Sequence, residues 1–164
     1  MDRRSFLKNS TVGVGATAAA TTLAAPIYAQ GKRTLTMVTS VPEGFAVFDD
    51  AAQNFADRVT AMTDGQLTID KKPAGTLVGA FEVFDAVSAG QADLYHSAEY
   101  YFLGQHPGLA YFTSVPFGMT GPEFMSWYYH NGGQELHHEL GSIFNLRPMI
   151  AGNTGHQPGG WFNK

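Results

Sequence analysis

A glycine-rich segment near the end of the chain carries side chains suited to binding a small ligand. Residues 152–162, Gly-Asn-Thr-Gly-His-Gln-Pro-Gly-Gly-Trp-Phe, combine two amides, one imidazole and two aromatic rings with four glycines. An amide offers a donor and an acceptor on one side chain, and glycine lets the backbone come close to a ligand. Two interpretations stay open: the segment lines a binding cleft, or it is an exposed glycine turn followed by an apolar strand.

A cluster of aromatic side chains forms a second candidate site. Tyr100-Tyr101-Phe102 follows residues 92–97, which have the pattern of a strand and include His96 near its end. In a cleft wall, a tyrosine donates from its phenol to an anionic or carbonyl oxygen while its ring covers the carbons of the ligand. The alternative is that the cluster packs the strand end against the next helix. His96 also has two interpretations, a cleft residue or a hydrogen-bonded histidine of the core.

The sequence His137-His138-Glu139 resembles part of a zinc site. A metalloprotease helix needs its second histidine four residues after the first, and the residue four after His138 is Ser142. The pattern therefore fails, and we expect both histidines to be solvated residues of a helix surface.

Other catalytic chemistries lack their motifs. The chain has no cysteine, which excludes disulfides, thiolate zinc sites and cysteine nucleophiles. Its serines lie outside any nucleophile elbow, and it has no phosphate-binding loop. The glycine pattern of residues 13–18 imitates a dinucleotide-binding fingerprint, but no strand precedes it. The sequence therefore favours a binding module over an enzyme.

Alternating strand and helix patterns predict the elements that position these side chains. Period-two alternation predicts strands over 34–39, 66–71 and 92–97, and three- to four-residue spacing predicts helices over 45–62 and 79–89. In the first helix we expect the charged residues to lie opposite one apolar stripe. The stripe consists of Phe48, Ala52, Phe55, Val59 and Met62. Such alternation indicates an α/β fold with a parallel sheet, where ligands bind beyond the carboxyl ends of the strands.

The second half of the chain is mostly helical in pattern. After an irregular stretch over 105–119, Pro122 favours the start of a helix at Gly121. The inward residues of this helix and of a further one over 134–144 are expected to be Phe124, Trp127, Tyr128, Leu136, Leu140, Ile143 and Phe144. Residues 146–151 then predict a short strand that leads into the glycine-rich segment.

The first residues have the pattern of an export signal. Arg3-Arg4 precedes a weakly apolar run over 11–25, which predicts a twin-arginine signal cleaved after Ala29. The rival interpretation is a membrane anchor, but the run is short and rich in alanine and threonine. A net charge of −4 and the lack of a basic cluster exclude nucleic acid as the partner, and 164 residues suffice for one domain with a core.

Several of these motifs together resemble one protein family. They are the twin-arginine start, the run from His96 to Gly104, Val115-Pro116-Phe117, residues 127–133 and the glycine-rich segment 152–162. The chain is similar to the substrate-binding subunits of TRAP (tripartite ATP-independent periplasmic) transporters, of the DctP type, in the 2-oxo acid-binding branch. The likeness covers nearly the whole chain, and the last motif is its most specific part.

The resemblance implies half of a two-lobe protein. Members have two α/β lobes of the type II periplasmic-binding-protein-like fold, joined by hinge strands, and are roughly twice this length. Residues 1–29 would be the signal peptide and 30–147 the first lobe. Residues 148–164 would be the hinge-crossing strand and the start of the second lobe, so that the chain is truncated near the hinge.

The resemblance also implies roles for individual residues. Tyr101 would contact the ligand from the first lobe with Tyr100 beside it, and Asn153 would hydrogen-bond the substrate from the hinge region. Gln157 would reach the ligand and, where the branch binds a cation, help to coordinate it. Glu99 stands where a relative has a small residue. The arginine that clamps the substrate carboxylate would lie in the second half, and Arg147 is not its counterpart.

The implied function is transport without catalysis. The subunit would capture a small organic acid in the periplasm, with pyruvate the first candidate, and deliver it to the TRAP membrane permease subunits. No cofactor is required; a sodium or calcium ion bound with the substrate, and a homodimer of the full-length protein, are further implications. Two alternatives remain: the N-terminal half of a periplasmic enzyme, and a sensory ligand-binding module on the same lobe fold.

Overall fold

The computed structural model describes residues 31–155. The chain divides into two units, Met1–Gly31 and Lys32–Lys164, and all the described helices and strands belong to the second unit. The predicted twin-arginine signal, its cleavage site after Ala29 and the proposed ligand residue Gln157 lie outside the described residues. Within the described part, no helix combines the length and the apolar character that crossing a membrane requires.

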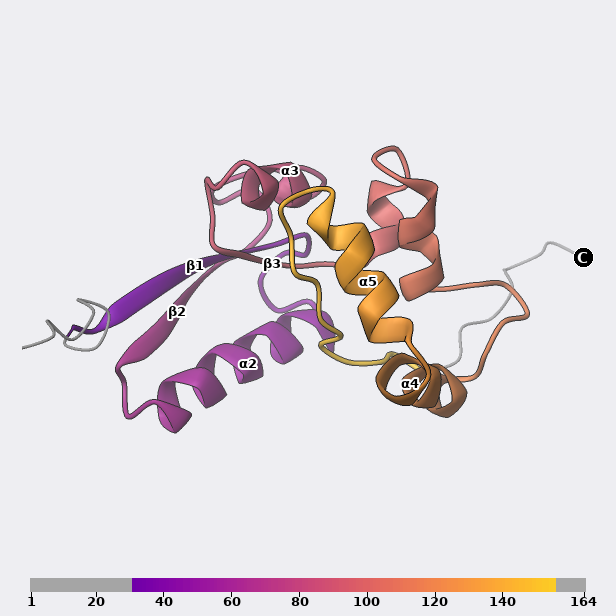
Figure 1. Ribbon diagram of the computed structural model, residues 1–164. Helices are drawn as coiled ribbons and strands as arrows, with labels where there is room; N and C mark the ends of the chain where they lie inside the picture. The colour runs from indigo at the N-terminus through magenta and orange to yellow at the C-terminus, as the bar shows by residue number, and fades with distance from the viewer. Residues whose placement is uncertain (1–30, 156–164) are drawn as a thin grey trace, which may run out of the picture. The chain divides into compact units, whose positions relative to one another are not determined.

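A three-stranded parallel sheet forms the first half of the unit, as the sequence predicts. The strands are β1 (Arg33–Thr39), β2 (Leu67–Lys72) and β3 (Leu94–His96), in the spatial order β2-β1-β3 (Figure 1). Because β1 pairs with β2 along its length and with β3 only from Met37 to Thr39, the sheet is widest at its carboxyl edge. The central strand is buried at that edge, where the loops that follow the strands emerge.

Helix α2 (Phe48–Met62) connects β1 to β2, but its buried face differs from the predicted stripe. Its buried residues are Asp49, Ala52 and Ala56. By contrast, Phe55 is 48% exposed and Met62 is 85% exposed. The small alanines let the helix approach the sheet closely, and Asp49 is buried because its carboxylate pairs with Lys71 of β2.

Helix α3 (Val83–Ser88) is shorter than predicted because a turn occupies residues 79–82. The Gly79 amide donates to the Glu82 carboxylate at 2.8 Å, which holds this turn instead of a helical bond. Val83 and Phe84 of α3 are almost fully buried, and burying each such side chain contributes about 1.5–3 kcal/mol. The core around them consists of Val38, Val83, Phe84, Ala92, Phe102, Leu109 and Leu140.

The second half consists of short helices. Two 3-10 helices, η2 (Glu99–Phe102) and η3 (Pro107–Phe112), follow β3, so the stretch expected to be irregular contains an ordered turn. Helix α4 (Gly121–His130) begins as predicted, with a capping box between Thr120 and Glu123.

A tight turn at Gly132, with φ +86°, separates α4 from α5 (Gly133–Ser142). Leu140 of α5 is buried and Phe144 packs on the core, as predicted. The prediction is wrong for Leu136, which is 52% exposed, and for Ile143, which is 66% exposed. Gly133, His137, Leu140 and Gly141 form the buried face instead.

The predicted strand over 146–151 is absent, because these residues adopt no regular secondary structure. A strand needs a neighbour for its hydrogen bonds, and this segment pairs with none of the described strands. It is held by packing instead: a side chain at Gly141 would meet the Pro148 ring at 2.3 Å, so only glycine lets Pro148 lie against α5. The segment then runs past the end of α2 toward α4 (Figure 1).

Candidate functional site

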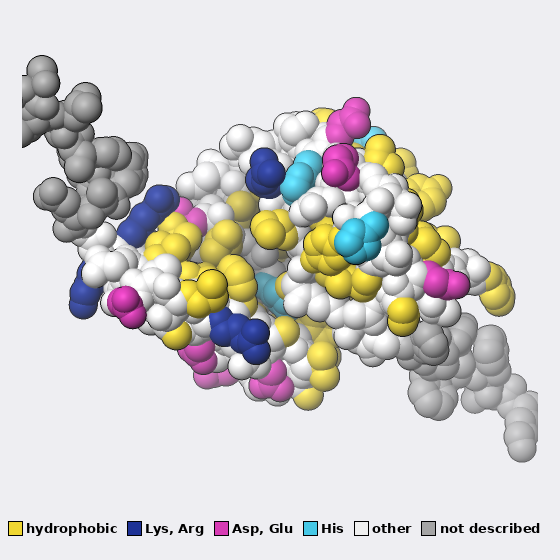
Figure 2. Space-filling view, turned by 60° about the horizontal axis from the view of Figure 1, so that its bottom comes forward, with side chains coloured by type: hydrophobic (Ala, Val, Ile, Leu, Met, Phe, Trp, Pro, Cys, Tyr) yellow, Lys and Arg dark blue, Asp and Glu magenta, His cyan; other side chains and the backbone are white. Residues whose placement is uncertain are grey.

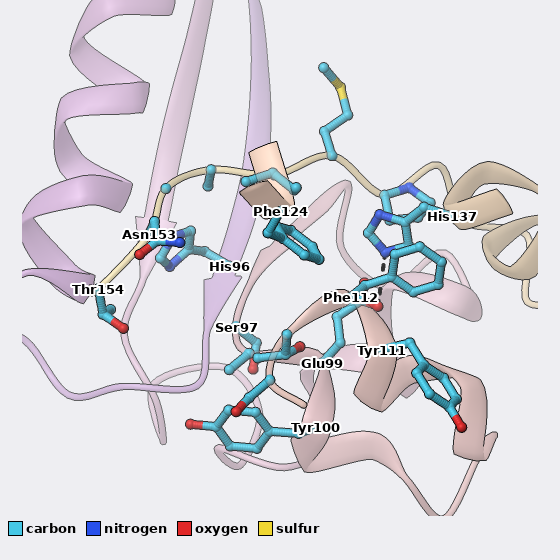
Figure 3. A pocket seen from close by; sticks show the side chains of 18 of the residues that line it. His96, Ser97, Glu99, Tyr100, Tyr111, Phe112, Phe124, His137, Asn153 and Thr154 are labelled. Atoms are coloured by element: carbon cyan, nitrogen blue, oxygen red, sulfur yellow. Dashed lines mark hydrogen bonds and ion pairs between the residues drawn. The ribbon is translucent and has the colours of Figure 1, made fainter. Parts of the chain in front are cut away.

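A large open cavity lies at the carboxyl edge of the sheet. Its volume is about 1870 Å³, whereas small-molecule sites commonly measure about 300–1,000 Å³. Its walls come from β1, α2, α3, β3, η2, η3, α4, α5 and the segment after α5. They include His96, Ser97, Glu99, Tyr100, Phe112, Phe124, His137 and Asn153 (Figure 3). The molecule's surface carries many exposed hydrophobic side chains, which gather in patches on the face drawn in Figure 2.

Hydrogen bonds join the loops that follow β1 and β3. The Ser97 hydroxyl donates to the Ser40 hydroxyl at 2.7 Å, and the Ser40 amide donates to the His96 carbonyl at 3.2 Å. These two loops therefore lie at the same carboxyl edge of the sheet. On the same side, the Asp49 carboxylate accepts from the Gly44 amide at 2.9 Å and pairs with Lys71, which fixes the β1–α2 loop. The bond from Lys71 is the main cause that lowers the pKa of Asp49.

The two tyrosines of η2 point to different surroundings. Tyr100 is half-buried and lines the cavity. Tyr101 is 43% exposed, packs edge-on against Phe81 with ring centroids 5.5 Å apart, and is not among the described residues that line the cavity. The hydrogen bond with Tyr101, together with burial, raises the pKa of Tyr100, so its phenol stays protonated. Phe102 lies in the core, which bears out packing for this member of the cluster.

Asn153 reaches the cavity from the segment after α5. Its side-chain oxygen accepts the Gly155 amide at 2.6 Å, which closes a turn around the asparagine. The Asn153 amide also lies against the start of α4, because a side chain at Gly121 would meet its Nδ2 at 3.1 Å. The residue thus brings the glycine-rich segment to the same cavity as Tyr100, although 53 positions separate them in the printed sequence.

A buried hydrogen-bonded chain links α4, α5 and η2. His137 is 3% exposed; its Nε2 lies 2.9 Å from a Glu99 carboxylate oxygen and its Nδ1 lies 3.0 Å from the Tyr128 hydroxyl (Figure 3). Because the carboxylate accepts only, Nε2 donates to Glu99, and in the neutral ring the Tyr128 hydroxyl then donates to Nδ1. Phe112 stacks on the His137 ring with centroids 4.1 Å apart, and the Tyr95 hydroxyl donates to Glu99 at 3.3 Å.

The prediction that His137 and His138 are solvated is wrong. His137 is buried, and His138 is half-buried with its Nε2 sealed from solvent. The four- and three-residue spacing of Gly133, His137 and Leu140 is the signal that places His137 on the inward face. Burial raises the pKa of Tyr128 to about 12, and the nearby Tyr129 and Glu99 add to the shift. Burial and Glu99 also raise the pKa of Tyr95.

His96 is half-buried at the end of β3, with its ring edge-on to Phe48 at a centroid distance of 6.4 Å. Among the described residues, its Nδ1 has neither solvent access nor a hydrogen-bond partner. The alternative of a hydrogen-bonded core histidine is therefore wrong for this nitrogen. Burial lowers the pKa of His96, and the negative charge of Asp49 partly opposes that shift.

The acidic and histidine side chains of the described residues do not gather in a group of metal ligands. Between residues 31 and 155 there is no group of three or more histidine, aspartate or glutamate residues that could hold a metal ion. The Asn153 oxygen is already bonded to the Gly155 amide, and the Glu99 carboxylate to His137 and Tyr95.

Comparison with known proteins identifies the family of this chain. Residues 37–156 match the bacterial extracellular solute-binding proteins of family 7, known as DctP. The chain belongs to this family. The match runs from the middle of β1 past Asn153, so it includes every element that lines the cavity.

Three relatives show what part of a family 7 protein this chain represents. The monocarboxylate 2-oxoacid-binding periplasmic protein of Nostoc sp. is 41% identical over 78% of this chain and 35% of its own length. A TRAP periplasmic solute-binding protein from Colwellia psychrerythraea, crystallised with calcium and pyruvate, superposes with a TM-score of 0.78 at 37% identity. A second, from Pseudoalteromonas atlantica with sodium and pyruvate, also gives 0.78, at 41% identity.

The chain covers 40% of each of these two structures, while they account for 81% of the chain. The described fold is thus that of one α/β lobe of a TRAP periplasmic binding protein, as the fold-class prediction states.

Proposed function

We propose that this chain is the first lobe of the extracytoplasmic solute-binding subunit of a TRAP transporter. The complete subunit captures a small 2-oxo acid, with pyruvate as the first candidate. One observation carries the proposal. The cavity at the carboxyl edge of the sheet brings Tyr100 together with Asn153, in a chain 37% and 41% identical to two proteins crystallised with pyruvate.

The cavity chemistry supports an acid of this kind. A protonated phenol at Tyr100, the hydroxyl of Ser97 and the amide of Asn153 supply uncharged hydrogen-bond groups among apolar walls such as Phe124. Such groups orient a small ligand, while hydrophobic surface covers its carbons. The carboxylate still needs a positive partner, and a bidentate arginine from the second lobe is the strongest one available to proteins. The volume of the open cavity, well above the need of a three-carbon acid, fits a cleft that a second lobe fills.

The rest of the proposal concerns the remaining ligand contacts, the export of the protein and its partners. Tyr101, which lies beside Tyr100 but outside the described cavity wall, and Gln157 are the further ligand contacts in this proposal, with Gln157 also at a sodium or calcium ion bound with the acid. The family's extracellular placement supports a periplasmic subunit; we infer that residues 1–29 direct it through the twin-arginine route. Residues 30–147 form the first lobe and 148–164 lead into the second. The subunit delivers its ligand to the membrane permease, acts as a homodimer, and catalyses no reaction.

Calorimetry of the complete two-lobe protein tests the proposal. Pyruvate should bind with a dissociation constant near or below about 1 μM, equivalent to roughly −8 kcal/mol. Succinate, whose second carboxylate has no counter-charge, should bind at least about a hundredfold more weakly, and the 164-residue chain alone should show no such tight binding. Binding of succinate in preference to every 2-oxo monocarboxylate would contradict the substrate class.

A further inference from the structure

His96 is a polar side chain of the cavity to which the proposed function gives no role. It closes β3 at the carboxyl edge of the sheet, and its ring lines the same cavity as Tyr100 and Asn153 (Figure 3). Within residues 31–155, its Nδ1 is sealed from solvent without a hydrogen-bond partner. A buried polar atom without a partner is uncommon in folded proteins and calls for an explanation.

The surroundings of the ring determine where its proton sits. A neutral imidazole has one nitrogen that donates and one that accepts. A donor sealed at Nδ1 would waste a hydrogen bond, whereas an unprotonated acceptor there is the less costly orphan. The neutral ring therefore carries its hydrogen on Nε2.

The charges around His96 keep the ring neutral near pH 7. Burial is the largest influence and lowers the pKa of His96, while the carboxylate of Asp49 acts in the opposite direction. Asp49 is itself paired with Lys71 of β2, and the Glu99 carboxylate of η2 is bonded to His137. Neither carboxylate is hydrogen-bonded to the His96 ring, and the effect of burial outweighs the opposing charge of Asp49.

We propose that His96 is a ligand-contact residue of this cavity and donates its Nε2 hydrogen to an oxygen of the bound organic acid. The inference rests on the proposed function. Carboxylate and keto oxygens only accept, so they match a neutral donor at the sheet edge where ligands of α/β folds bind. Because the ring does not change charge, it adds affinity without taking up a proton.

Calorimetry of the two-lobe protein with pyruvate tests this with two matched substitutions. Glutamine carries its amide nitrogen near the position of Nε2, whereas asparagine reaches only the position of Nδ1. We expect H96Q to bind pyruvate within about threefold of the wild type and H96N to bind at least about tenfold more weakly, the loss of one hydrogen bond. H130Q is the control, since His130 is an exposed residue at the end of α4 outside the cavity, and its affinity should not change.

Two further readouts separate the possible failures. If the wild type binds pyruvate and both His96 variants bind equally well, His96 makes no contact and only this inference falls. If the wild type binds no 2-oxo acid, the proposed function falls and the inference with it. Nitrogen-15 spectra of the histidine rings of the wild type should show His96 in the Nε2–H form with and without pyruvate. This measurement does not depend on the folding of the variants. Proton uptake on binding by the wild type, absent in H96Q, would overturn the neutral donor.

Discussion

Replacing His137 by alanine should destabilise the lobe strongly, because the ring connects three elements from a buried position. Its Nδ1 accepts from Tyr128, whose side chain is fully buried, and its Nε2 donates to the Glu99 carboxylate at 2.9 Å. H137A removes both bonds and the stacking partner of Phe112.

The size of the loss depends on which groups the substitution leaves unpaired. A buried hydroxyl without its acceptor costs about 1–3 kcal/mol. The Glu99 carboxylate loses the bond from Nε2, and a buried acceptor left unpaired costs about 1–3 kcal/mol, but Glu99 keeps its bond from Tyr95, so the lower end applies. Together these give about 2–4 kcal/mol. That is a large share of the roughly 5–15 kcal/mol that stabilises a typical domain.

Urea denaturation followed by tryptophan fluorescence measures this loss, with Trp127 of α4 close to Phe112 as the reporter. The control is H130A, at an exposed position, where we expect a change within about 0.5 kcal/mol. H137Q, which can still donate toward Glu99, should lose less than H137A. A loss below about 1 kcal/mol for H137A, similar to the control, would refute the claim that the hydrogen bonds of His137 with Tyr128 and Glu99 stabilise the lobe.

Three further predictions concern other parts of the chain. The pKa of Asp49 is lowered in the folded state, chiefly by Lys71, so the pair's contribution is present above about pH 4 and is lost as the pH falls through the folded pKa. D49N should abolish this acid-dependent part in urea titrations at several pH values; an unchanged slope would contradict it. In the two-lobe protein, Q157A should weaken pyruvate binding at least about tenfold in calorimetry while the melting temperature of the free protein moves by only a few degrees; unchanged affinity with a large loss of stability would mean a structural role. Replacing Arg3 and Arg4 by lysine should leave precursor in the cytoplasm, as seen by fractionation and immunoblotting; undiminished periplasmic protein would exclude the twin-arginine route.

The regular part of the fold was predictable because its patterns are local. Strand alternation and helix spacing place β1, β2, β3 and α4 close to their observed positions, and alternation alone indicates the parallel sheet. The phase of α2 was not predictable in the same way. Its apolar stripe suggests that Phe55 faces inward, but the pairing of Asp49 with Lys71, 22 residues away, rotates the buried face.

The candidate site was predictable by residue type but not by contact. The sequence motifs predict Tyr100 and Asn153 as binding side chains; both line the cavity, and their binding role stays a prediction. The role of Glu99 and His137 depends on a pairing across 38 residues, which no local pattern reveals. The strand expected over 146–151 fails for a related reason, since strand formation depends on a partner that the segment itself does not specify.

The core of this lobe ends earlier in the chain than its binding surface does. Its buried cluster runs from Val38 to Leu140, whereas Asn153 lies on the segment beyond Pro148, which has no regular secondary structure. During synthesis, the residues that stabilise the lobe therefore leave the ribosome before the last of those that face the ligand, and N-terminal units generally fold first. Changes within 150–155 alter a scaffold that is already formed, so we expect this segment to accept substitutions that shift ligand choice at little cost in folding. A library randomised at these positions and sorted for protease resistance should keep most of its members, while the same randomisation at Val83, Phe84 or Leu140 should lose most of them.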